Sequence, residues 1–284
     1  MILKIDFNRN NLKIPVYGLA FLLLFFAHGC KKQKPWGDSL PEEEKKEPLK
    51  EILVPVKIET GKLVTELKYQ EGKSLLNEIS YPNGEVWKII YTKTGYPQRL
   101  ERYKNNKQLQ YFSYALDAEF RISKIQRWNN DNGNLSLAHQ YVLGYDKQSI
   151  ISTKKYDPLS NLLEEETRAY ATAGNLETTT NIKKNISESR SWTYDDKSGI
   201  FSNLPYADLF FLEEAYAELS MGKGNPLSTS SLKSPSENKT FSYTYNSNAY
   251  PSEIAIKKGN STETMKITYK IIKPGITSST GVLP

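Results

Sequence analysis

The chain has 284 residues, with 38 Lys and Arg against 32 Asp and Glu, so its formal charge is +6. Apolar residues make up 38% and charged residues 25%, a composition typical of folded globular proteins rather than of disordered chains. The single Cys and the two His exclude an intrachain disulfide framework and a multi-cysteine zinc site. We therefore expect neither a cofactor nor a metal.

The N-terminal segment has the layout of a secretory signal. Three basic residues precede an apolar run, 16–27, and small residues follow before Cys30. The run is shorter than the about 20 apolar residues that a helix needs to cross a membrane. A buried hydrophobic helix is the alternative, but the terminal position and abrupt ends of the run favour a signal peptide over residues 1–29.

The junction Ala27-His28-Gly29-Cys30 resembles the lipobox of bacterial lipoproteins, in which a signal peptidase cuts before a cysteine that becomes acylated. Gly29 fits the small residue before the cut, whereas Ala27 and His28 depart from the usual pattern. Lipidation would also explain an unpaired cysteine in an exported protein. We expect Cys30 to carry the lipid and to anchor the chain to a membrane. The resemblance implies the bacterial cell envelope, at the outer membrane.

Residues 30–50 are rich in Pro and charge and poor in apolar side chains, which predicts an extended tether. Removing residues 1–29 leaves 35 basic and 31 acidic residues, a charge of +4. This charge is too small to indicate nucleic acid as a partner. The predicted partners are the membrane, through the lipid, and a glycan or an envelope protein.

From about residue 52, short segments alternate apolar and polar residues and end at Gly, Asn, Asp or Pro. The segments 63–69, 75–81 and 87–91 are typical, and about a dozen such segments precede residue 200. Period-two alternation with regular turns predicts antiparallel β-hairpins. We expect residues 51–284 to form a single all-β domain, an antiparallel many-stranded meander that is curved or partly closed.

One segment, 203–220, has helical spacing instead, with Ala207, Phe211, Ala215 and Leu219 on one stripe. We expect one helix there, which begins near Asn203, ends near Gly222, and covers a concave face or an open end of the sheet.

Several hairpin turns have similar sequences. Residues 91–100 resemble 245–254, and 114–122 is a looser copy. These units, with the helix segment 204–209, resemble the YD (Rhs-type) repeats found in bacterial lipoproteins of unknown function. The resemblance spans roughly residues 60–272, although most units lack the turn Gly or the Arg of the pattern. It implies a β-meander and an envelope location, and it implies no reaction.

Candidate chemistry is sparse. His139 lies in an alternating strand and should pack with Tyr141 and Leu143. Carboxylate runs, which glycoside hydrolysis would need in pairs, are expected to be solvated; they are Glu164-Glu165-Glu166, Asp195-Asp196 and Glu213-Glu214. The oxygen-rich run 129–133 fits a hairpin turn better than a calcium site. We therefore assign no catalytic residue and favour a non-enzymatic protein.

The 19 Tyr have two interpretations, because Tyr is favoured in strands and also stacks on sugars. Tyr91, Tyr103 and Tyr111 are the candidate ligand-stacking aromatics, provided that they lie open on one face. The leading hypothesis is a lipid-anchored envelope module that binds a glycan, a peptide or a partner protein. The alternatives are a structural or assembly lipoprotein without a ligand and a glycan-processing enzyme.

Overall fold

The structure, a computed structural model, describes residues 51–147 and 149–273. The predicted signal peptide, Cys30 and the tether lie outside these residues. The described part contains sixteen strands, which run as follows: β1 (Ile52–Thr60), β2 (Leu63–Tyr69), β3 (Leu76–Ser80), β4 (Glu85–Tyr91), β5 (Pro97–Lys104), β6 (Lys107–Leu116), β7 (Ile122–Asp131), β8 (Asn134–Asp146), β9 (Ser149–Tyr156), β10 (Leu162–Tyr170), β11 (Leu176–Lys183), β12 (Ile186–Tyr194), β13 (Pro226–Ser231), β14 (Lys239–Tyr245), β15 (Pro251–Lys258) and β16 (Ser261–Ile272). The helices are α1 (Ala207–Phe210), α2 (Ala217–Ser220) and a 3-10 turn, Pro235–Glu237.

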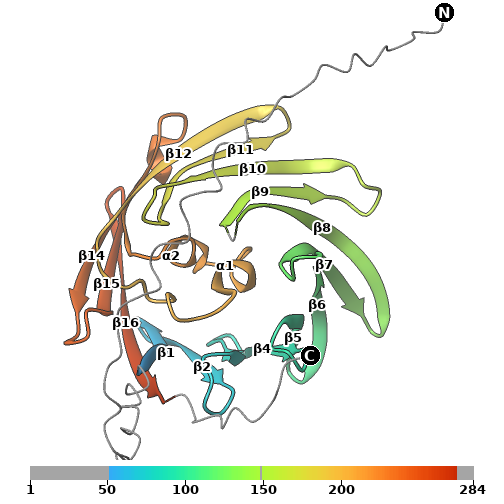
Figure 1. The fold of residues 1–284 in the computed structure, drawn as a ribbon, viewed down its shortest axis with the longest axis horizontal. Helices are drawn as coiled ribbons and strands as arrows, with labels where there is room; N and C mark the ends of the chain where they lie inside the picture. The colour runs from blue at the N-terminus through green and yellow to red at the C-terminus, as the bar shows by residue number, and fades with distance from the viewer. Residues whose placement is uncertain (1–50, 148, 274–284) are drawn as a thin grey trace, which may run out of the picture. The chain divides into compact units, whose positions relative to one another are not determined.

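The strands form a closed antiparallel barrel (Figure 1). Each strand pairs with its neighbours in the chain, and β1 pairs with β16, with Ile58 opposite Ile267 and Thr60 opposite Met265. The predicted all-β antiparallel meander is confirmed. The expected curved or partly closed sheet is wrong, because the first and last strands pair along most of their length and leave no edge.

The barrel has two ends. At the terminal end, β1 begins and β16 ends, so Ile52 and Ile272 lie side by side. The opposite end carries the hairpin turns that follow β1, β3, β5 and every second strand up to β15. Residue 51, which follows the predicted tether in the chain, is therefore at the terminal end.

Side chains alternate between the interior and the outer wall, as the pleat of a strand requires. In β2, Thr65, Leu67 and Tyr69 are buried, while Glu66 and Lys68 are exposed. The outer wall carries ion pairs and a hydroxyl-rich sector. The ion pairs include Lys57–Glu59, Lys68–Glu78 and Lys154–Glu165, at 2.9, 2.8 and 3.2 Å. The hydroxyl side chains include Thr178, Thr180, Ser189, Ser191, Thr193, Ser228 and Ser230.

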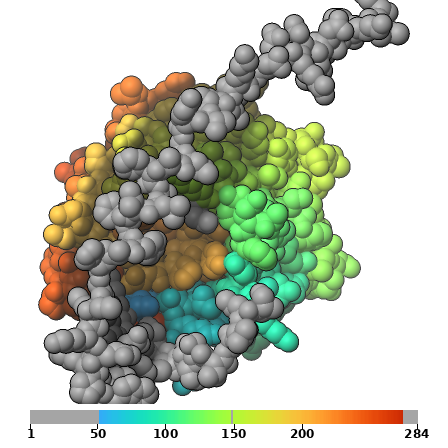
Figure 2. Space-filling model, viewed as in Figure 1, coloured from blue at the N-terminus to red at the C-terminus, as the bar shows by residue number. Residues whose placement is uncertain are grey.

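Residues 195–225, here called the plug, leave the wall after β12 and return to it at β13. Both α1 and α2 belong to the plug and lie inside the ring of strands (Figure 1). In the space-filling view, plug atoms occupy the interior of the ring (Figure 2). The prediction that this segment covers a concave face is confirmed, because the face is the barrel interior. No helix within the described ranges is long and apolar enough to cross a membrane.

The expected single helix over 203–220 is wrong, because the segment contains two four-residue helices. Tyr206 has φ 64°, a left-handed conformation that a regular helix does not contain. The Asn203 amide, expected to cap a helix, donates to the Leu53 carbonyl and to the Tyr250 hydroxyl at 2.9 and 2.8 Å. Contacts with the wall therefore override the helical pattern.

The root of the plug is held by polar contacts at the terminal end. The Asn225 backbone N–H donates to the Asp195 carboxylate at 2.9 Å, and the Asn175 side chain accepts the N–H groups of Lys223 and Gly224 at 3.0 and 2.9 Å. Gly224 also lies so close to the Asp195 carbonyl that an added Cβ would be 2.8 Å from it. The chain thus enters and leaves the barrel through a tight, hydrogen-bonded neck.

Six hairpin turns share one backbone geometry. In each, the N–H of the first residue donates to the carbonyl of the fifth, and the N–H of the fourth donates to the carbonyl of the first. The fourth residue has positive φ in every case. These fourth residues are Gly84, Gly95, Phe120, Ser160, Gly174 and Ala249. The predicted similarity of segments 91–100 and 245–254 is confirmed at the level of the backbone. The relation to YD repeats stays a prediction.

The core is shared between plug and wall. Phe211 is fully buried and packs against Phe201 and Tyr216, at ring-centroid distances of 4.8 and 5.6 Å. Phe210 makes edge contacts with the wall residues Tyr91 and Tyr114. The apolar interior is therefore continuous from the strands through the plug.

We expect Phe211→Ala to lower the free energy of unfolding by about 3–5 kcal/mol, because it opens a cavity in the centre of the plug. Urea unfolding of the full chain measures this change. Leu159→Ala is the matched control, since Leu159 is 82% exposed and its truncation should stay within about 0.5 kcal/mol of the wild type. Equal effects for the two variants would contradict a packed plug.

Candidate functional site

The tip of the plug carries two adjacent glutamates inside the barrel. The Glu213 carboxylate accepts hydrogen bonds from the Arg127 guanidinium at 2.8 Å, from His139 Nε2 at 2.6 Å and from the Tyr141 hydroxyl. Lys155 Nζ lies 3.4 Å away. Three consecutive strands, β7, β8 and β9, therefore converge on one carboxylate. The expectation that Glu213 and Glu214 are solvated is wrong, because the plug places them in the interior.

The pKa of Glu213 lies well below its usual value. Burial acts to raise it, but the hydrogen bonds from His139 and Tyr141 and the charges of His139 and Lys155 outweigh burial. An ionised carboxylate only accepts hydrogen bonds, so His139 Nε2 carries a proton. The prediction that His139 packs with Tyr141 on one strand face is confirmed, and its partner is the plug.

Glu214 has the opposite environment. Burial raises the pKa of its carboxyl to about 7, and the negative charges of Glu213 and Glu85 add to this effect. Arg102 opposes the rise through an ion pair with Glu214 at 3.3 Å. Arg102 also binds Glu85 at 3.1 Å and lies over the Trp87 ring at 4.6 Å, so its single charge is shared.

Two neighbouring carboxyls with opposite pKa shifts are a pattern of acid–base catalysis. The space that the two carboxyls share argues against their use as a pair, although Glu214 also borders a larger cavity described below. The cavity that Glu213 and Glu214 line with Phe112, Tyr114 and Phe210 has a volume of about 10 Å³, which is too small for a substrate. The geometry instead makes Glu213 a charged latch between the plug and the wall.

A larger cavity opens at the opposite end of the barrel, beside α2. It has a volume of about 540 Å³, and apolar side chains from β14, β15, β16 and the plug form much of its lining. The polar groups in it include Glu214, Glu218, Glu263 and the Tyr81 hydroxyl, which is buried and has no hydrogen-bond partner among the described residues. We call this cavity the open mouth.

A second cavity of about 340 Å³ lies on the other side of α2 and shares Glu218 with the open mouth. Its charges are largely paired: Glu166 with Arg168 at 2.6 Å, and Glu188 with Arg190 at 3.4 Å. Glu218 itself binds Lys239 at 2.6 Å. The plug is thus attached by charge to two sides of the wall.

Asp195, from the predicted carboxylate run Asp195-Asp196, accepts a hydrogen bond from the Asn225 backbone and so holds the plug root.

The three predicted ligand-stacking tyrosines do not share one open face. Tyr91 faces the interior and donates its hydroxyl to the Leu76 carbonyl at 2.8 Å. Tyr111 faces the outer wall but is only 9% exposed, because Arg99 and Trp128 lie against its two sides. Tyr103 is also on the outer wall, and its hydroxyl donates to Glu101 at 2.6 Å.

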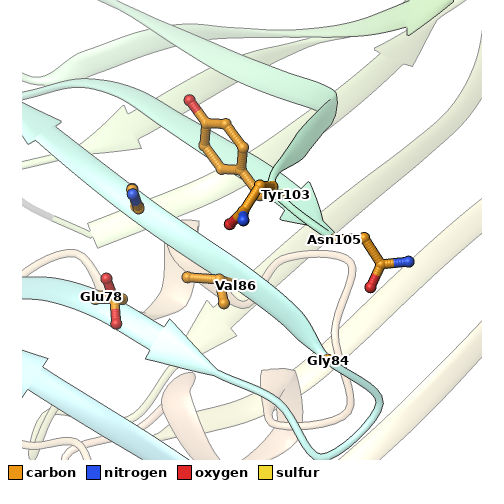
Figure 3. Close-up of a pocket in the computed structure, with 7 residues that line it drawn as sticks. Glu78, Gly84, Val86, Tyr103 and Asn105 are labelled. Atoms are coloured by element: carbon orange, nitrogen blue, oxygen red, sulfur yellow. The ribbon is translucent and has the colours of Figure 1, made fainter.

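A shallow groove of about 380 Å³ surrounds Tyr103 on the outer wall (Figure 3). Glu78, Val86 and Asn105 line it, and Lys88 lies 5.3 Å from the centre of the Tyr103 ring. One tyrosine, one Val side chain and a few solvated polar groups form this groove, so it offers a ligand little enclosed surface.

Groups of three or more His, Cys, Asp or Glu side chains placed to hold a metal are absent from the described part of the chain. The run 129–133 spans the end of β7 and the two-residue turn, Asn132-Gly133, that leads to β8, so the hairpin interpretation is confirmed. There the Gly133 N–H donates to the Asn130 side chain at 2.8 Å.

Comparison with known proteins gives the fold alone. Neither the family models nor the curated proteins that were searched match the chain. Among solved structures, the chain is similar to a porin-like protein from Bacteroides uniformis ATCC 8492, with a TM-score of 0.50 and 12% identity over 78% of this chain and 97% of that one. A porin-like protein from Bacteroides vulgatus ATCC 8482 matches with a TM-score of 0.49 and 13% identity, over 76% and 99% of the two chains.

We expect Glu214→Gln to stabilise the protein by up to about 3 kcal/mol above pH 7. The wild-type native state holds a proton on Glu214 up to a pKa of about 7, whereas the unfolded state loses it near the ordinary glutamate pKa of 4.5. Wild-type stability therefore falls as the pH rises between these values, and Gln escapes that loss. Urea unfolding at pH 5 and pH 8 tests this, and a larger gain at pH 5 would contradict it.

The neighbouring variant, Glu213→Gln, should destabilise the protein, in contrast to Glu214→Gln. Its lowered pKa gives the wild type stability that is present above the unfolded pKa of 4.5 and is lost as the pH falls through the folded value. Removing the charge leaves the partly buried cations Arg127 and Lys155 of the wall without their carboxylate, at a cost of up to about 3 kcal/mol at pH 7. A smaller cost at acidic pH, measured in the same unfolding series, is expected.

Proposed function

We propose that the protein is a lipid-anchored module of the bacterial cell envelope, at the outer membrane, that binds a glycan or a similar polar ligand without catalysis. The barrel stands in water beside the membrane, with the lipid on Cys30 as the anchor. The open mouth, at the end of the barrel away from residue 51, is the ligand site. The single observation that carries the proposal is this cavity, which lies at the end of the barrel opposite residues 51 and 273.

The outer wall supports a barrel in water. Membrane-spanning barrels present a continuous apolar band to lipid, and a Lys or Arg there costs about 2–4 kcal/mol at mid-depth. Here the outward positions of β2, β3, β9 and β10 carry the ion pairs Lys68–Glu78 and Lys154–Glu165. The hydroxyl side chains of β11 to β13 continue this polar surface around the barrel.

The filled lumen supports binding rather than transport. Barrels of 16–18 strands can leave an aqueous channel, but Phe211 and the latch at Glu213 occupy this one. The neighbour from Bacteroides uniformis is described as porin-like, which agrees with an envelope setting for this fold. The six shared turns likewise support the relation to YD-repeat lipoproteins.

The chemistry of the open mouth fits a sugar. Apolar side chains such as Leu219 and Phe241 provide a surface for the ring carbons, while Glu218 and Lys239 supply an acceptor and a donor for hydroxyls. A peptide or a partner protein would use the same surface.

A structural or assembly role is the second candidate. Tightly packed tyrosines and the plug fill the concave face, which is what a purely structural module needs. In that case the open mouth would bind no glycan.

We expect Cys30→Ser to move the protein from membrane to soluble fractions, because one lipidated residue is the proposed anchor. Fractionation of cells that express the full chain measures this. Persistent membrane attachment of the variant would contradict the lipid anchor. It would also contradict the proposal that the barrel itself stands in water.

We expect Ser261→Trp to abolish glycan binding, because Ser261 lines the open mouth and the indole would fill it. Thr262→Trp is the matched control, since the adjacent side chain points to the outer wall and is also exposed. A glycan array with the full chain in detergent compares the two variants with the wild type. Wild-type silence on all glycans would favour the structural candidate, and equal loss in both variants would place the site elsewhere.

A further inference from the structure

A third cavity lies at the terminal end, between the wall and α1. It has a volume of about 380 Å³, and four aromatic residues line it: Tyr96, Phe120, Tyr145 and Tyr206. Two carboxylates, Glu119 and Asp208, line it as well. Two hairpin turns, the end of β8 and the plug therefore bring their side chains to one place that the open mouth does not include.

Two of these aromatic residues have a strained backbone. Phe120 has φ 60° and Tyr206 has φ 64°, in the left-handed region that bulky residues avoid. Phe120 occupies the fourth position of the shared turn, where the other five turns have Gly, Ser or Ala. Strain of this kind concentrates at functional sites, because folding alone does not select for it.

Burial of the side chain does not explain why a phenylalanine occupies position 120 with a positive φ. Its side chain is 63% exposed, and its main described neighbour is Tyr96, with the two rings stacked at 5.9 Å and an angle of 22°. An exposed aromatic ring in a strained position, stacked on a second ring beside a cavity, is a surface prepared for a ligand.

The charge in the cavity is negative. The half-buried Asp208 carboxylate forms no ion pair with any described residue. The nearby Arg168, which is bonded to Glu166 at 2.6 Å, attracts it from a greater distance, while burial raises the pKa of the Asp208 carboxyl. Arg121, the cation in the lining, already binds Asp117 and Glu119 at 2.9 and 3.1 Å. A cationic ligand that enters therefore meets a carboxylate whose charge the protein compensates only in part, beside aromatic rings.

We propose that this cavity is an aromatic cage that binds an organic ammonium group, with Asp208 as its counter-charge. Aromatic ring faces attract cations, and cages of several rings with a carboxylate are suited to alkylated ammonium groups. The ammonium comes either from a free amine or from a phospholipid headgroup. The second source rests on the proposed lipid anchor, because residue 51 and this cavity are both at the terminal end of the barrel.

Titration calorimetry of the full chain, in a maltoside detergent that carries no ammonium, tests the cage. The probes are choline, its uncharged carbon analogue 3,3-dimethylbutanol, and glycerophosphoethanolamine. We expect choline to bind with a Kd of about 1 mM or lower and at least about tenfold more tightly than the neutral analogue. Tighter binding of choline points to a free amine, and tighter binding of glycerophosphoethanolamine points to a lipid headgroup; either supports the cage.

Three variants separate the site from the stability of the fold. Phe120→Gly should weaken choline binding at least about tenfold while its thermal midpoint stays at or above the wild-type value, because Gly relieves the strain. Ala249→Gly changes the same position of another turn and should leave binding unchanged. Asp208→Asn tests the counter-charge and should weaken choline binding but not that of the neutral analogue.

The proposal is overturned if the wild type shows no saturable binding of either ammonium probe up to about 10 mM. Equal affinity for choline and its neutral analogue would also overturn it, as would unchanged choline binding in both Phe120→Gly and Asp208→Asn. None of these results bears on glycan binding at the opposite end of the barrel, so the two proposals fail separately.

Discussion

The closure of sixteen strands into one barrel is the constraint on which the rest of the structure depends. A barrel of this circumference encloses more space than the side chains of its own strands fill. The plug supplies the missing volume, and Phe211 at its centre is fully buried. The hydrogen-bonded neck at Asp195 and Asn225 then lets thirty-odd residues of chain enter and leave the barrel at one point of the wall without breaking the ring of strands.

Charge decides how the plug sits in this space. Hydrophobic packing alone is tolerant of small shifts, whereas a buried carboxylate must find its donors. Glu213 meets Arg127, His139 and Tyr141 on one side of the barrel, and Glu218 meets Lys239 on another. Glu214 lies between them, with its pKa raised by burial and by its acidic neighbours. Glu213 and Glu218 therefore orient the tip, whereas Glu214 shares its cation, Arg102, with Glu85 and is destabilised in its ionised form by the neighbouring negative charges.

The same arrangement separates the two ends of the barrel. The plug root, the start of β1, the end of β16 and the aromatic cavity around Phe120 lie at the terminal end, and the open mouth beside α2 lies at the other. Between them the lumen is filled, and the outer wall carries ion pairs and a hydroxyl-rich sector among exposed apolar side chains such as Ile90 and Ile151. These features favour a protein that presents binding surfaces at its ends rather than a passage through its middle.

Much of the barrel wall was predictable from local pattern. The alternation of Thr65, Leu67 and Tyr69 with Glu66 and Lys68 assigns both the strand and its buried face, because period-two patterning needs no knowledge of distant residues. The hairpin turns were predictable for the same reason, since Gly at positive φ is a local requirement. The inward basic residues Arg102 and Arg127 were the missed signal: each shares a strand face with apolar residues, which marks a buried charge that needs a partner.

The sequence by itself determined an antiparallel all-β meander and the expectation of an exported, lipid-anchored chain, because strand alternation and the N-terminal motif each depend only on residues close together in the chain. Only the tertiary structure decided that the meander closes, that the helical stripe over 203–220 breaks into two short helices, and that Glu213 and Glu214 lie inside. It also separated Tyr91 from Tyr103 and Tyr111. Each of these outcomes depends on contacts between residues far apart in the chain, such as β1 with β16 and Glu213 with Arg127, whose energies overrule local preference.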